Sequence, residues 1–524
     1  MPNFELVVVL LFFDYYNYFY YIHGGKTMKK AWKWLESILL LMILLTIIPQ
    51  NVGAASKTAP KVTDNYLQKV KQKGELIMGT SPDFPPYEFV KNINGKSKVE
   101  GIDVEIGKKV AHDLGVKLVV RTMDFDSLLV ALETGKIDMV ISGMDATPKR
   151  AQSVDFSHAY YKSGQDLLIR TSDKNKYHDY HSFAGKAIGA QTGSLQATLI
   201  KEQAKKVTLK TMDKDSDLIL GLQTKKFDAV AVDTATAGAF AKNTSGITAI
   251  PSGFKVDSAG SAIAFHKGAK SLVNAANKSI AEIKQKDLIN QVYLPKAGKY
   301  LTNGKNQKAA KASNSMWAYK DFFIAGVGYT LFISAISVFF GFLLGAILAL
   351  MRLSHNQFAH TIAKAYIEFV RGTPLMVQLL FIYFGLGLII NIPALLSGII
   401  AVALNSAAYV AEVIRSGVSS IAKGQTEASR SLGLSRSATM RYVIMPQAMK
   451  NIWPALGNEF VSLIKESSIV SVIGVKDLIY QSRIVQADTY RGVMPLVITM
   501  ILYFIITFSL SSLMKVFERK MKHD

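Results

Sequence analysis

The chain of 524 residues contains no cysteine. This absence excludes disulfide bonds, thiolate metal sites and cysteine nucleophiles, and it excludes lipid anchoring of an exported domain through an N-terminal cysteine. A complete phosphate-binding loop is also missing, because two Gly-Lys segments that come close to it carry Tyr20 and Val90 where the motif requires its first glycine. We therefore expect no ATP site, no metal and no cofactor in this chain.

Acidic residues are few relative to basic ones. The chain has 39 Asp and Glu against 61 Lys and Arg, a formal net charge of +22. In a soluble protein this excess would suggest a nucleic-acid partner, but no groove-like pattern of interleaved aromatic and basic residues accompanies it. Hydrophobic residues make up 49% of the chain, which suits a soluble part joined to a membrane part. The excess charge then reflects the positive-inside bias or an anionic membrane surface, and we expect no nucleic acid.

Residues 28–56 have the pattern of a signal peptide. A basic segment with three lysines precedes an apolar stretch from Ile38 to Ile48, and the small residues of VGAAS follow as a cleavage site. The next segment is thus predicted to lie outside the cytoplasm; an uncleaved anchor helix is the alternative. Residues 1–27 do not fit this pattern. We predict that translation begins at Met28 and that residues 1–27 are an untranslated upstream extension, the alternative being a membrane segment from Phe4 to Ile22.

Apolar runs alternate with helical patterns between Lys57 and Gly298. GELIMGT, VKLVVRT and IDMVISGM have the composition of strands, whereas IGKKVAHDLG and SLLVALETG have the composition of helices. This alternation predicts a mainly parallel α/β sheet that binds ligands at the carboxyl ends of its strands. The pattern restarts at GKAIGAQTGS and FDAVAVD. Two α/β lobes with a cleft between them would form a hinged clamp around a ligand.

Five segments of this region resemble the polar-amino-acid family of bacterial extracellular solute-binding proteins. They are GTSPDFPPYEF, GIDVEIGKKVAHDLG, FDSLLVALETGKIDMVISGMDATPKRAQSVDFSHAYYKSG, GAQTGS and FDAVAVD, in this order. The resemblance covers the whole of residues 57–298 and implies the two-lobed (type II) periplasmic-binding-protein fold, with an amino acid as the ligand.

The resemblance also implies a set of substrate-binding residues. Arg150 would bind the substrate carboxylate through two parallel hydrogen bonds, as its planar guanidinium allows, and Asp233 would bind the α-ammonium. Phe84 and Phe125 match the aromatic walls of the site. The other predicted contacts are Ser81, Ser142, Gly143, Asp145, Thr147, Gln191, Thr192 and Ser194.

Three positions bear on the substrate and on local structure. Asp145 departs from the Ser or Thr that is commoner in the family, and Ser81 stands where relatives for basic amino acids often carry Asp. With Gln191 opposite, the pocket suits a neutral polar side chain, and glutamine is our first prediction. Asp103 is expected to have a structural role.

A polar linker, residues 299–316, precedes a membrane region that we assign to residues 317–524. Five apolar spans are predicted there, each long enough to cross a bilayer. They are approximately Phe323–Leu350, Val370–Ile390, Pro393–Ile414, Ile452–Val475 and Val493–Leu513.

The charges between these spans predict the topology. The connection after the third span and the C-terminal tail are rich in Lys and Arg, which places both in the cytoplasm and the binding domain outside. The chain is thus expected to be a multi-pass protein of the plasma membrane. Gly341 and Gly345 form a GxxxG pair that would allow close helix packing.

The cytoplasmic loop between spans three and four carries the stretch EASRSLGLSRSATMRYVIMPQA. It resembles the ATPase-coupling loop of bacterial ABC importer permeases, through Glu427, Ala428, Gly433 and Pro446. Ser429 replaces the commoner second Ala of that motif. We expect Gly433 to turn the chain between two short helices and Pro446 to end the second of them.

The resemblances together predict an importer subunit in which an amino-acid receptor is fused to its own permease. The chain itself would not be an enzyme; a separate cytoplasmic ATPase would hydrolyse ATP, and two permease copies would form the path. The alternative is a ligand-gated ion channel, because the GVGYT stretch at Gly326–Thr330 is similar to a potassium filter. A filter, however, lies in a re-entrant loop, whereas this stretch stands at the start of a span.

Overall fold

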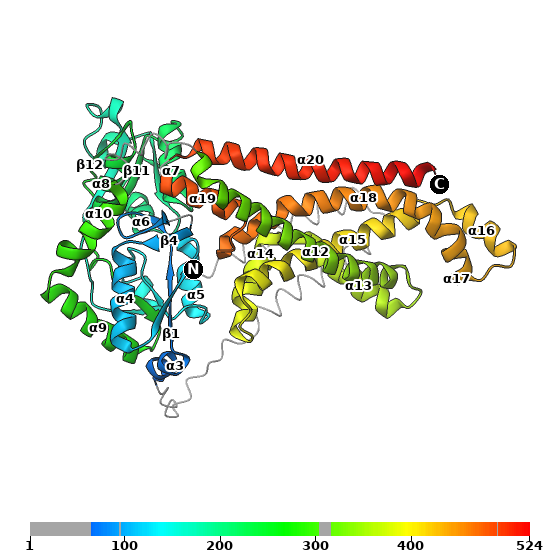
Figure 1. Cartoon of the computed structure of the whole chain (residues 1–524), viewed down its shortest axis with the longest axis horizontal. Coiled ribbons are helices and arrows are strands. Elements are labelled where there is room, and N and C mark those ends of the chain that lie inside the picture. Colours follow the sequence, from blue (N-terminus) through cyan, green and yellow to red (C-terminus); the bar gives the residue numbers. More distant parts are fainter. Residues whose placement is uncertain (1–63, 94–95, 303–315, 490, 524) are drawn as a thin grey trace, which may run out of the picture. The chain divides into compact units, whose positions relative to one another are not determined.

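The computed structural model describes residues 64–93, 96–302, 316–489 and 491–523. The predicted signal peptide and the predicted upstream extension lie outside these residues. Figure 1 shows an α/β region in residues 64–302 and a helical region that begins at residue 316. The predicted linker is partly helical, because helix α10 (Leu294–Thr302) runs into its first residues.

The first lobe is built on a five-stranded sheet in the order β5-β1-β6-β13-β7. Only β13 runs against its neighbours. The strands are β5 (Lys117–Thr122), β1 (Glu75–Thr80), β6 (Met139–Val140), β13 (Ala264–His266) and β7 (Val154–Phe156).

Side chains of alternate strand residues fill the two faces of this sheet. Leu76 and Met78 of β1 are buried against helices α3 (Tyr66–Lys73), α4 (Ile102–Leu114) and α9 (Lys270–Gln285), whereas Ile77 faces helix α5 (Leu128–Glu133). A small antiparallel sheet of β2 (Asp83–Phe84), β3 (Glu88–Ile93) and β4 (Lys96–Glu100) adjoins the lobe.

The second lobe repeats this topology with the strand order β10-β9-β11-β8-β12. Here β8 is the reversed strand. The strands are β10 (Thr208–Met212), β9 (Ala187–Gln191), β11 (Ala229–Asp233), β8 (Gln165–Arg170) and β12 (Ile247–Pro251), and the helices are α6 (Leu195–Gln203), α7 (Asp215–Gln223) and α8 (Thr234–Asn243).

Two connections, residues 157–164 and 252–263, join the lobes, since the chain leaves the first lobe after β7 and returns to it at β13. The prediction of two similar, mainly parallel α/β lobes is therefore confirmed. The carboxyl ends of the parallel strands carry the loops that form the site.

Long helices dominate the region after residue 316. They are α12 (Lys320–Leu353), α13 (Gln357–Gly372), α15 (Ala394–Ser419), α18 (Met445–Glu466), α19 (Leu478–Thr489) and α20 (Val493–His523). The remaining α-helices, α14 (Leu375–Leu380), α16 (Lys423–Ser431) and α17 (Arg436–Thr439), are short. Helices α12, α15, α18 and α20 pack against one another in sequence (Figure 1).

The structure does not confirm five membrane spans. Within the described residues, the stretches Met316–Leu353, Ala394–Ser419 and Val493–Val516 are each long and apolar enough to cross a membrane. A fourth span is possible only if Gln357–Gly372 and Leu375–Leu388 count together, and these are bent by 106°. The predicted span Ile452–Val475 corresponds to α18 followed by a 3₁₀ helix, Ser467–Ile473, and does not reach the same apolarity.

The bend at Thr373-Pro374 explains why the predicted span Val370–Ile390 was wrong in its bounds. Pro374 has no backbone N–H to continue α13, so a new helix starts after it. The Gln378 side chain donates to the carbonyl oxygen of Val370 at 2.7 Å and to that of Thr373 at 3.1 Å. It thereby satisfies acceptors that the break leaves without helical partners, as a broken helix within a membrane requires.

The Gly341/Gly345 pair does allow close packing of two helices. A Cβ atom at Gly341 would lie 2.8 Å from the hydroxyl of Ser406, and one at Gly345 would lie 2.7 Å from Val410. Both neighbours belong to α15, so the glycines let the backbones of α12 and α15 approach each other more closely than larger residues would permit.

Candidate functional site

A cavity of about 420 Å³ lies between the two lobes. It is lined by Ser81, Phe84, Glu88, Phe125, Ser142, Gly143, Asp145 and Arg150 of the first lobe and by Gln191, Ser194, Gln196, Asp215, Ala231 and Val232 of the second. Every predicted substrate-binding residue is in this lining except Thr147, Thr192 and Asp233. The motifs that are far apart in the sequence therefore converge on one space.

Arg150 extends from the first lobe across the cavity. Its Nη1 donates to the backbone oxygen of Asp145 at 2.8 Å, and its Nη2 donates to the backbone oxygen of Gly193, in the second lobe, at 3.0 Å. The guanidinium carbon lies 5.4 Å from the centre of the Phe125 ring, a cation–π distance. Burial lowers the pKa of Arg150 from its usual value, yet Arg remains charged at neutral pH. The cavity thus contains a fixed, oriented cation.

A buried loop of the first lobe positions Phe84 in the cavity wall. Gly143 has φ +53°, and a Cβ atom on it would lie 2.7 Å from the Phe84 ring, so only glycine allows both the backbone conformation and the ring position. The Gly143 N–H donates to Asp103 Oδ2 at 2.6 Å, and the Tyr160 hydroxyl donates to the same oxygen at 2.8 Å. The structural role expected for Asp103 is therefore confirmed, because it holds the loop that carries Gly143.

Small polar side chains complete the first-lobe wall. The Ser142 hydroxyl donates to Glu88 Oε1 at 2.7 Å and accepts from the Ser81 N–H at 3.0 Å. The Ser81 hydroxyl in turn donates to Asp83 at 2.9 Å. These bonds fix Ser81 and Ser142 where strands β1 and β6 end.

The second-lobe wall comes from the turn between β9 and α6. Ser194 is the N-cap of α6, and its hydroxyl accepts from the Ala197 N–H at 3.1 Å. The Gln191 side chain donates to the backbone oxygen of Asp213 at 3.2 Å. Thr192 is held by a bond from its N–H to the Met212 oxygen, and its side chain is not in the lining.

Asp233 lies just beyond the lining, behind Val232. Its Oδ1 accepts from the Ala235 N–H at 2.8 Å, which caps α8, and from the Tyr87 hydroxyl at 3.1 Å. Burial raises the pKa of the Asp233 carboxyl to about 6. Thr147 also has a local role in this structure, since its hydroxyl accepts from the Arg150 N–H at 3.4 Å.

Sequence reasoning missed five lining residues: the polar Glu88, Gln196 and Asp215 and the apolar Ala231 and Val232. The carboxyl groups of Glu88 and Asp215 are almost fully buried, and each has one oxygen without a hydrogen-bond partner among the described residues. Burial raises the pKa of both well above the usual range, with a further contribution from the charge of Asp103 for Glu88 and of Asp83 for Asp215. Burial also raises the pKa of Asp145. The cavity therefore contains several carboxyl groups and one guanidinium.

The predicted coupling loop forms two short helices, α16 and α17, joined by a turn at Gly433. Gly433 has φ +86°, as expected of a residue that reverses the chain, and the Leu434 N–H donates back to the Ser429 oxygen. The buried Ser429 hydroxyl donates to Thr426 and Thr439, which explains a serine at this place. Glu427 and Ala428 are exposed on α16.

We expected Pro446 to end the second short helix, but the structure shows that it does not. It lies in the first turn of α18, directly after a π-helical turn, Met440–Ile444, that continues from α17. Proline tolerates the first turn of a helix because it needs no N–H there, and the wider turn before it accommodates the missing donor. The loop therefore passes into α18 without a break.

Two family descriptions match this sequence. Residues 76–295 match the bacterial extracellular solute-binding proteins, family 3, and residues 341–523 match the binding-protein-dependent transport system inner membrane component. The putative glutamine transport system permease protein GlnP of Rickettsia conorii is 41% identical over 202 residues, which are 38% of this chain and 93% of that protein. The chain belongs to this family of inner-membrane transport components. Its first half makes it a fused receptor and permease.

Other relatives cover the same two parts of the fused permease. The arginine transport system permease protein ArtQ of Bacillus subtilis is 40% identical over 39% of this chain and 94% of its own length. Among solved structures, an amino-acid ABC transporter substrate-binding protein from Streptococcus pneumoniae bound to L-arginine is 34% identical, with a TM-score of 0.44, over 45% of this chain and 98% of that one.

The membrane part of the fused permease also bears on the channel alternative. The GVGYT stretch lies inside the continuous helix α12, so its backbone carbonyls point along the helix axis rather than into a loop. A filter needs rings of free carbonyl oxygens. Instead, the helical region has a large open cavity of about 1310 Å³ beside the break between α13 and α14, lined among others by Arg371, Asn405 and Glu466.

Proposed function

We propose that this protein imports a polar amino acid as the fused receptor and permease of an ABC transporter. The observation that carries the proposal is the cavity between the lobes, in which Arg150 from one lobe and the β9–α6 turn from the other meet. A free amino acid offers a carboxylate that a planar guanidinium recognises through paired hydrogen bonds. The relatives named for glutamine and arginine transport support the same substrate class.

The α-ammonium group has two candidate partners near this cation. Asp233 is the residue expected from the family, and it sits behind Val232 with its carboxyl already bonded to Tyr87. Glu88 is in the lining itself, with one free oxygen. We assign the ammonium to Asp233, because its carboxyl already accepts a hydrogen bond from a polar donor, the Tyr87 hydroxyl.

The identity of the side chain divides into two candidates. Glutamine fits the hydroxyl of Ser81, which donates to Asp83 and can still accept, and the amide of Gln191, which can both donate and accept. Asp215 favours instead a cationic side chain such as that of arginine, because its free carboxylate oxygen is buried and in the lining. A cation there would restore the ionised form of a carboxyl group whose pKa burial has raised.

A separate cytoplasmic ATPase would dock on the coupling loop. Leu432 at the end of α16 is 84% exposed beside the Gly433 turn, an apolar side chain available to a partner surface. Exposed Glu427 and Ala428 lie on the same short helix. The positive charges around this loop support a cytoplasmic position for it and an external position for the binding domain.

Two copies of the chain would form the translocation path. Only three or four stretches of the described residues qualify as spans, which is few for a complete path. The large open cavity beside the break between α13 and α14 would then be half of a shared path.

Calorimetric titration of the purified full chain with each of the twenty amino acids tests the proposal. We expect binding of glutamine or of arginine and little binding of apolar amino acids. Arg150→Ala should weaken this binding by tens- to thousands-fold, whereas Lys149→Ala, an exposed neighbour, should not change it. Binding that is equally strong in the Arg150 variant, or no binding of any amino acid by the parent chain, would contradict the proposal.

A further inference from the structure

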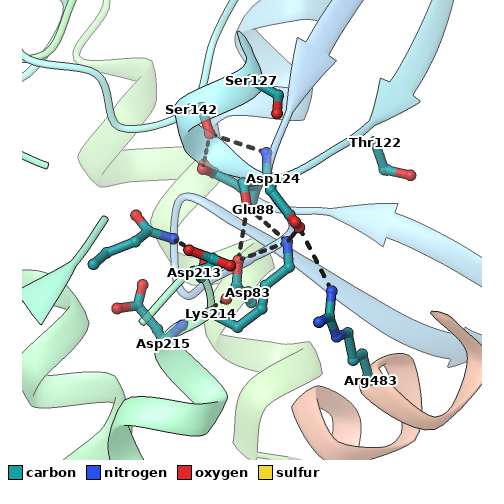
Figure 2. A network of polar contacts seen from close by, with 12 residues as sticks. Asp83, Glu88, Thr122, Asp124, Ser127, Ser142, Asp213, Lys214, Asp215 and Arg483 are labelled. Atoms are coloured by element: carbon teal, nitrogen blue, oxygen red, sulfur yellow. Dashed lines mark hydrogen bonds and ion pairs between the residues drawn. The ribbon is translucent and has the colours of Figure 1, made fainter. Parts of the chain in front are cut away.

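A second set of charges joins the two lobes outside the cavity. Lys214 of the second lobe is buried, and its Nζ lies 3.0 Å from Asp124, 3.0 Å from the Ser81 hydroxyl and 3.8 Å from Asp83. All three partners belong to the first lobe. Figure 2 shows the Lys214 side chain reaching between Asp83 and Asp124.

The helix that follows Lys214 adds a second contact across the lobes. Lys214 occupies the N-cap position of α7, but no side chain of its own lobe caps this helix. Instead, the first N–H of the helix, that of Asp215, donates to Asp83 Oδ2 of the other lobe at 2.7 Å. A carboxylate at a helix N-terminus is stabilised by the free N–H groups and by the helix dipole. Asp83 thus caps α7 from the opposite lobe.

All of these contacts cross from one lobe to the other, so separation of the lobes would break them. If the lobes separate, water solvates the carboxylates of Asp83 and Asp124 on the first lobe. Water also solvates the Lys214 ammonium and the N-terminus of α7 on the second lobe. If they close without Lys214, Asp83, Asp124 and Asp215 are buried close together with no cation from the second lobe. Burial lowers the pKa of Lys214, but the charges of Asp83 and Asp124 outweigh it and raise the pKa above its usual value, so the lysine is charged.

We propose that Lys214 and the N-terminus of α7 form an ionic latch with Asp83 and Asp124 that holds the clamp closed around its substrate. Lys214 is a positioning residue here, because it is not in the cavity lining. The latch depends on the proposed function in one respect: the substrate that closure encloses is an amino acid. Arg483 of α19 also lies 3.8 Å from Asp124, so the latch is best tested in the full chain.

Two introduced cysteines would report the closure, since the natural chain has none. Lys284→Cys on α9 and Lys201→Cys on α6 are exposed positions, one on each lobe, for a donor and an acceptor dye. Energy transfer between the dyes measures the closed fraction with and without glutamine or arginine, whichever the parent binds. Stopped-flow mixing of the same chain gives the association and dissociation rates.

Lys214→Met should lower the closed fraction of the substrate-free chain and weaken substrate binding at least about thirtyfold, the lower end of what the loss of one partner of a buried charge pair causes. The loss should appear in a faster dissociation rate, with association changed by less than about threefold. Lys210→Met, an exposed lysine on the preceding strand, should behave like the parent.

A double-mutant cycle separates the latch from a structural role within the second lobe. Once Asp124→Asn has removed one buried anion, Lys214→Met should cost clearly less affinity than it does alone. If the affinity losses of the two substitutions simply add, the latch is overturned. It is also overturned if Lys214→Met lowers the stability of the substrate-free chain, measured as its unfolding midpoint, by as much free energy as it lowers substrate binding. An unchanged closed fraction in Lys214→Met would also overturn it. If the parent binds neither amino acid, the proposed function fails, while closure of the substrate-free chain still decides on the latch.

Discussion

Gly433→Val should uncouple the coupling loop from the transport cycle while leaving the binding domain intact. At φ +86° a β-branched residue is strained by about 1–3 kcal/mol. Among the described residues, apart from Gly433 and its two chain neighbours, no atom lies within 4 Å of the position of the added Cβ, so the cost is in the backbone and not in a steric clash. Such a cost shifts the local equilibrium of the turn by roughly five- to 150-fold. The two short helices would then lose the fixed angle that presents α16 to a partner.

The assay is ATP hydrolysis by the chain reconstituted in lipid with its ATPase, with and without saturating amino acid. We expect stimulation by substrate to fall at least about fivefold in the variant, the lower end of this shift. Substrate binding should equal that of the parent. Gly424→Val is the matched control, because Gly424 lies in the adjacent short helix α16 with an ordinary φ and equally open space around it. If both variants hydrolyse ATP at the parent rate, the loop is a solvated connector and the reasoning is refuted.

Three further predictions concern the cavity. Arg150→Ala should weaken amino-acid binding by tens- to thousands-fold, about 2–5 kcal/mol, because it removes one partner of a desolvated charge pair; a calorimetric affinity equal to that of Lys149→Ala would refute this. The substrate ammonium needs an ionised Asp233, whose pKa is about 6 in the free protein. The affinity for the amino acid should therefore fall as the pH drops below 6, by up to about tenfold per pH unit. Asp233→Asn should remove this pH dependence. Asp215→Asn should lower the affinity for arginine at least about tenfold relative to that for glutamine; equal effects on both ligands would exclude Asp215 from side-chain recognition.

The sign of the Asp233 contribution to stability follows from the same pKa. Burial raises the pKa of this carboxyl above its value in the unfolded chain, so the unfolded state ionises more readily. Stability from this group is therefore greatest below pH 4 and decreases as the pH rises from about 4 to about 6. A bound ammonium group would offset the loss by favouring the charged form. The stability gained on substrate binding should thus be larger at pH 7 than at pH 5.

Much of the binding domain could be predicted because its signals are local. Strand and helix patterns indicated two similar lobes, and a few motifs at strand ends indicated the side chains that now line one cavity. Gly433 could be assigned to a turn from the motif alone. In each case the relevant physics, a turn or a strand end, is set by residues close together in the sequence.

The contacts that sequence reasoning missed depend on how distant segments meet. Asp215 and Glu88 look like ordinary surface acids in the sequence, but contacts with segments distant in the chain bury both of them. Lys214 likewise looks like a solvated lysine in the sequence. Only the folded structure brings Asp83 and Asp124 of the other lobe next to it. Asp233, in contrast, was expected in the lining of the cavity. Its carboxyl is instead held outside the lining by hydrogen bonds from the Ala235 N–H of helix α8 and from the Tyr87 hydroxyl.

The membrane region shows a different limit. Average hydropathy cannot locate a sharp bend, so the predicted span Val370–Ile390 ran across the break at Pro374. The polar residues of α18 similarly lower its apolarity below that of a lipid-facing helix, although the helix itself is long. Helices that face a protein interior or a path need not be apolar all round.

The most direct test of amino-acid import is uptake by liposomes that contain the full chain and its ATPase. Radiolabelled glutamine and arginine are supplied outside, on the side of the binding domain, and ATP is supplied inside. We predict accumulation of one of them against its gradient, which requires ATP and is lost in the Arg150→Ala variant. Amino-acid-dependent ion current without ATP, or labelled substrate that only equilibrates across the membrane, would contradict the account.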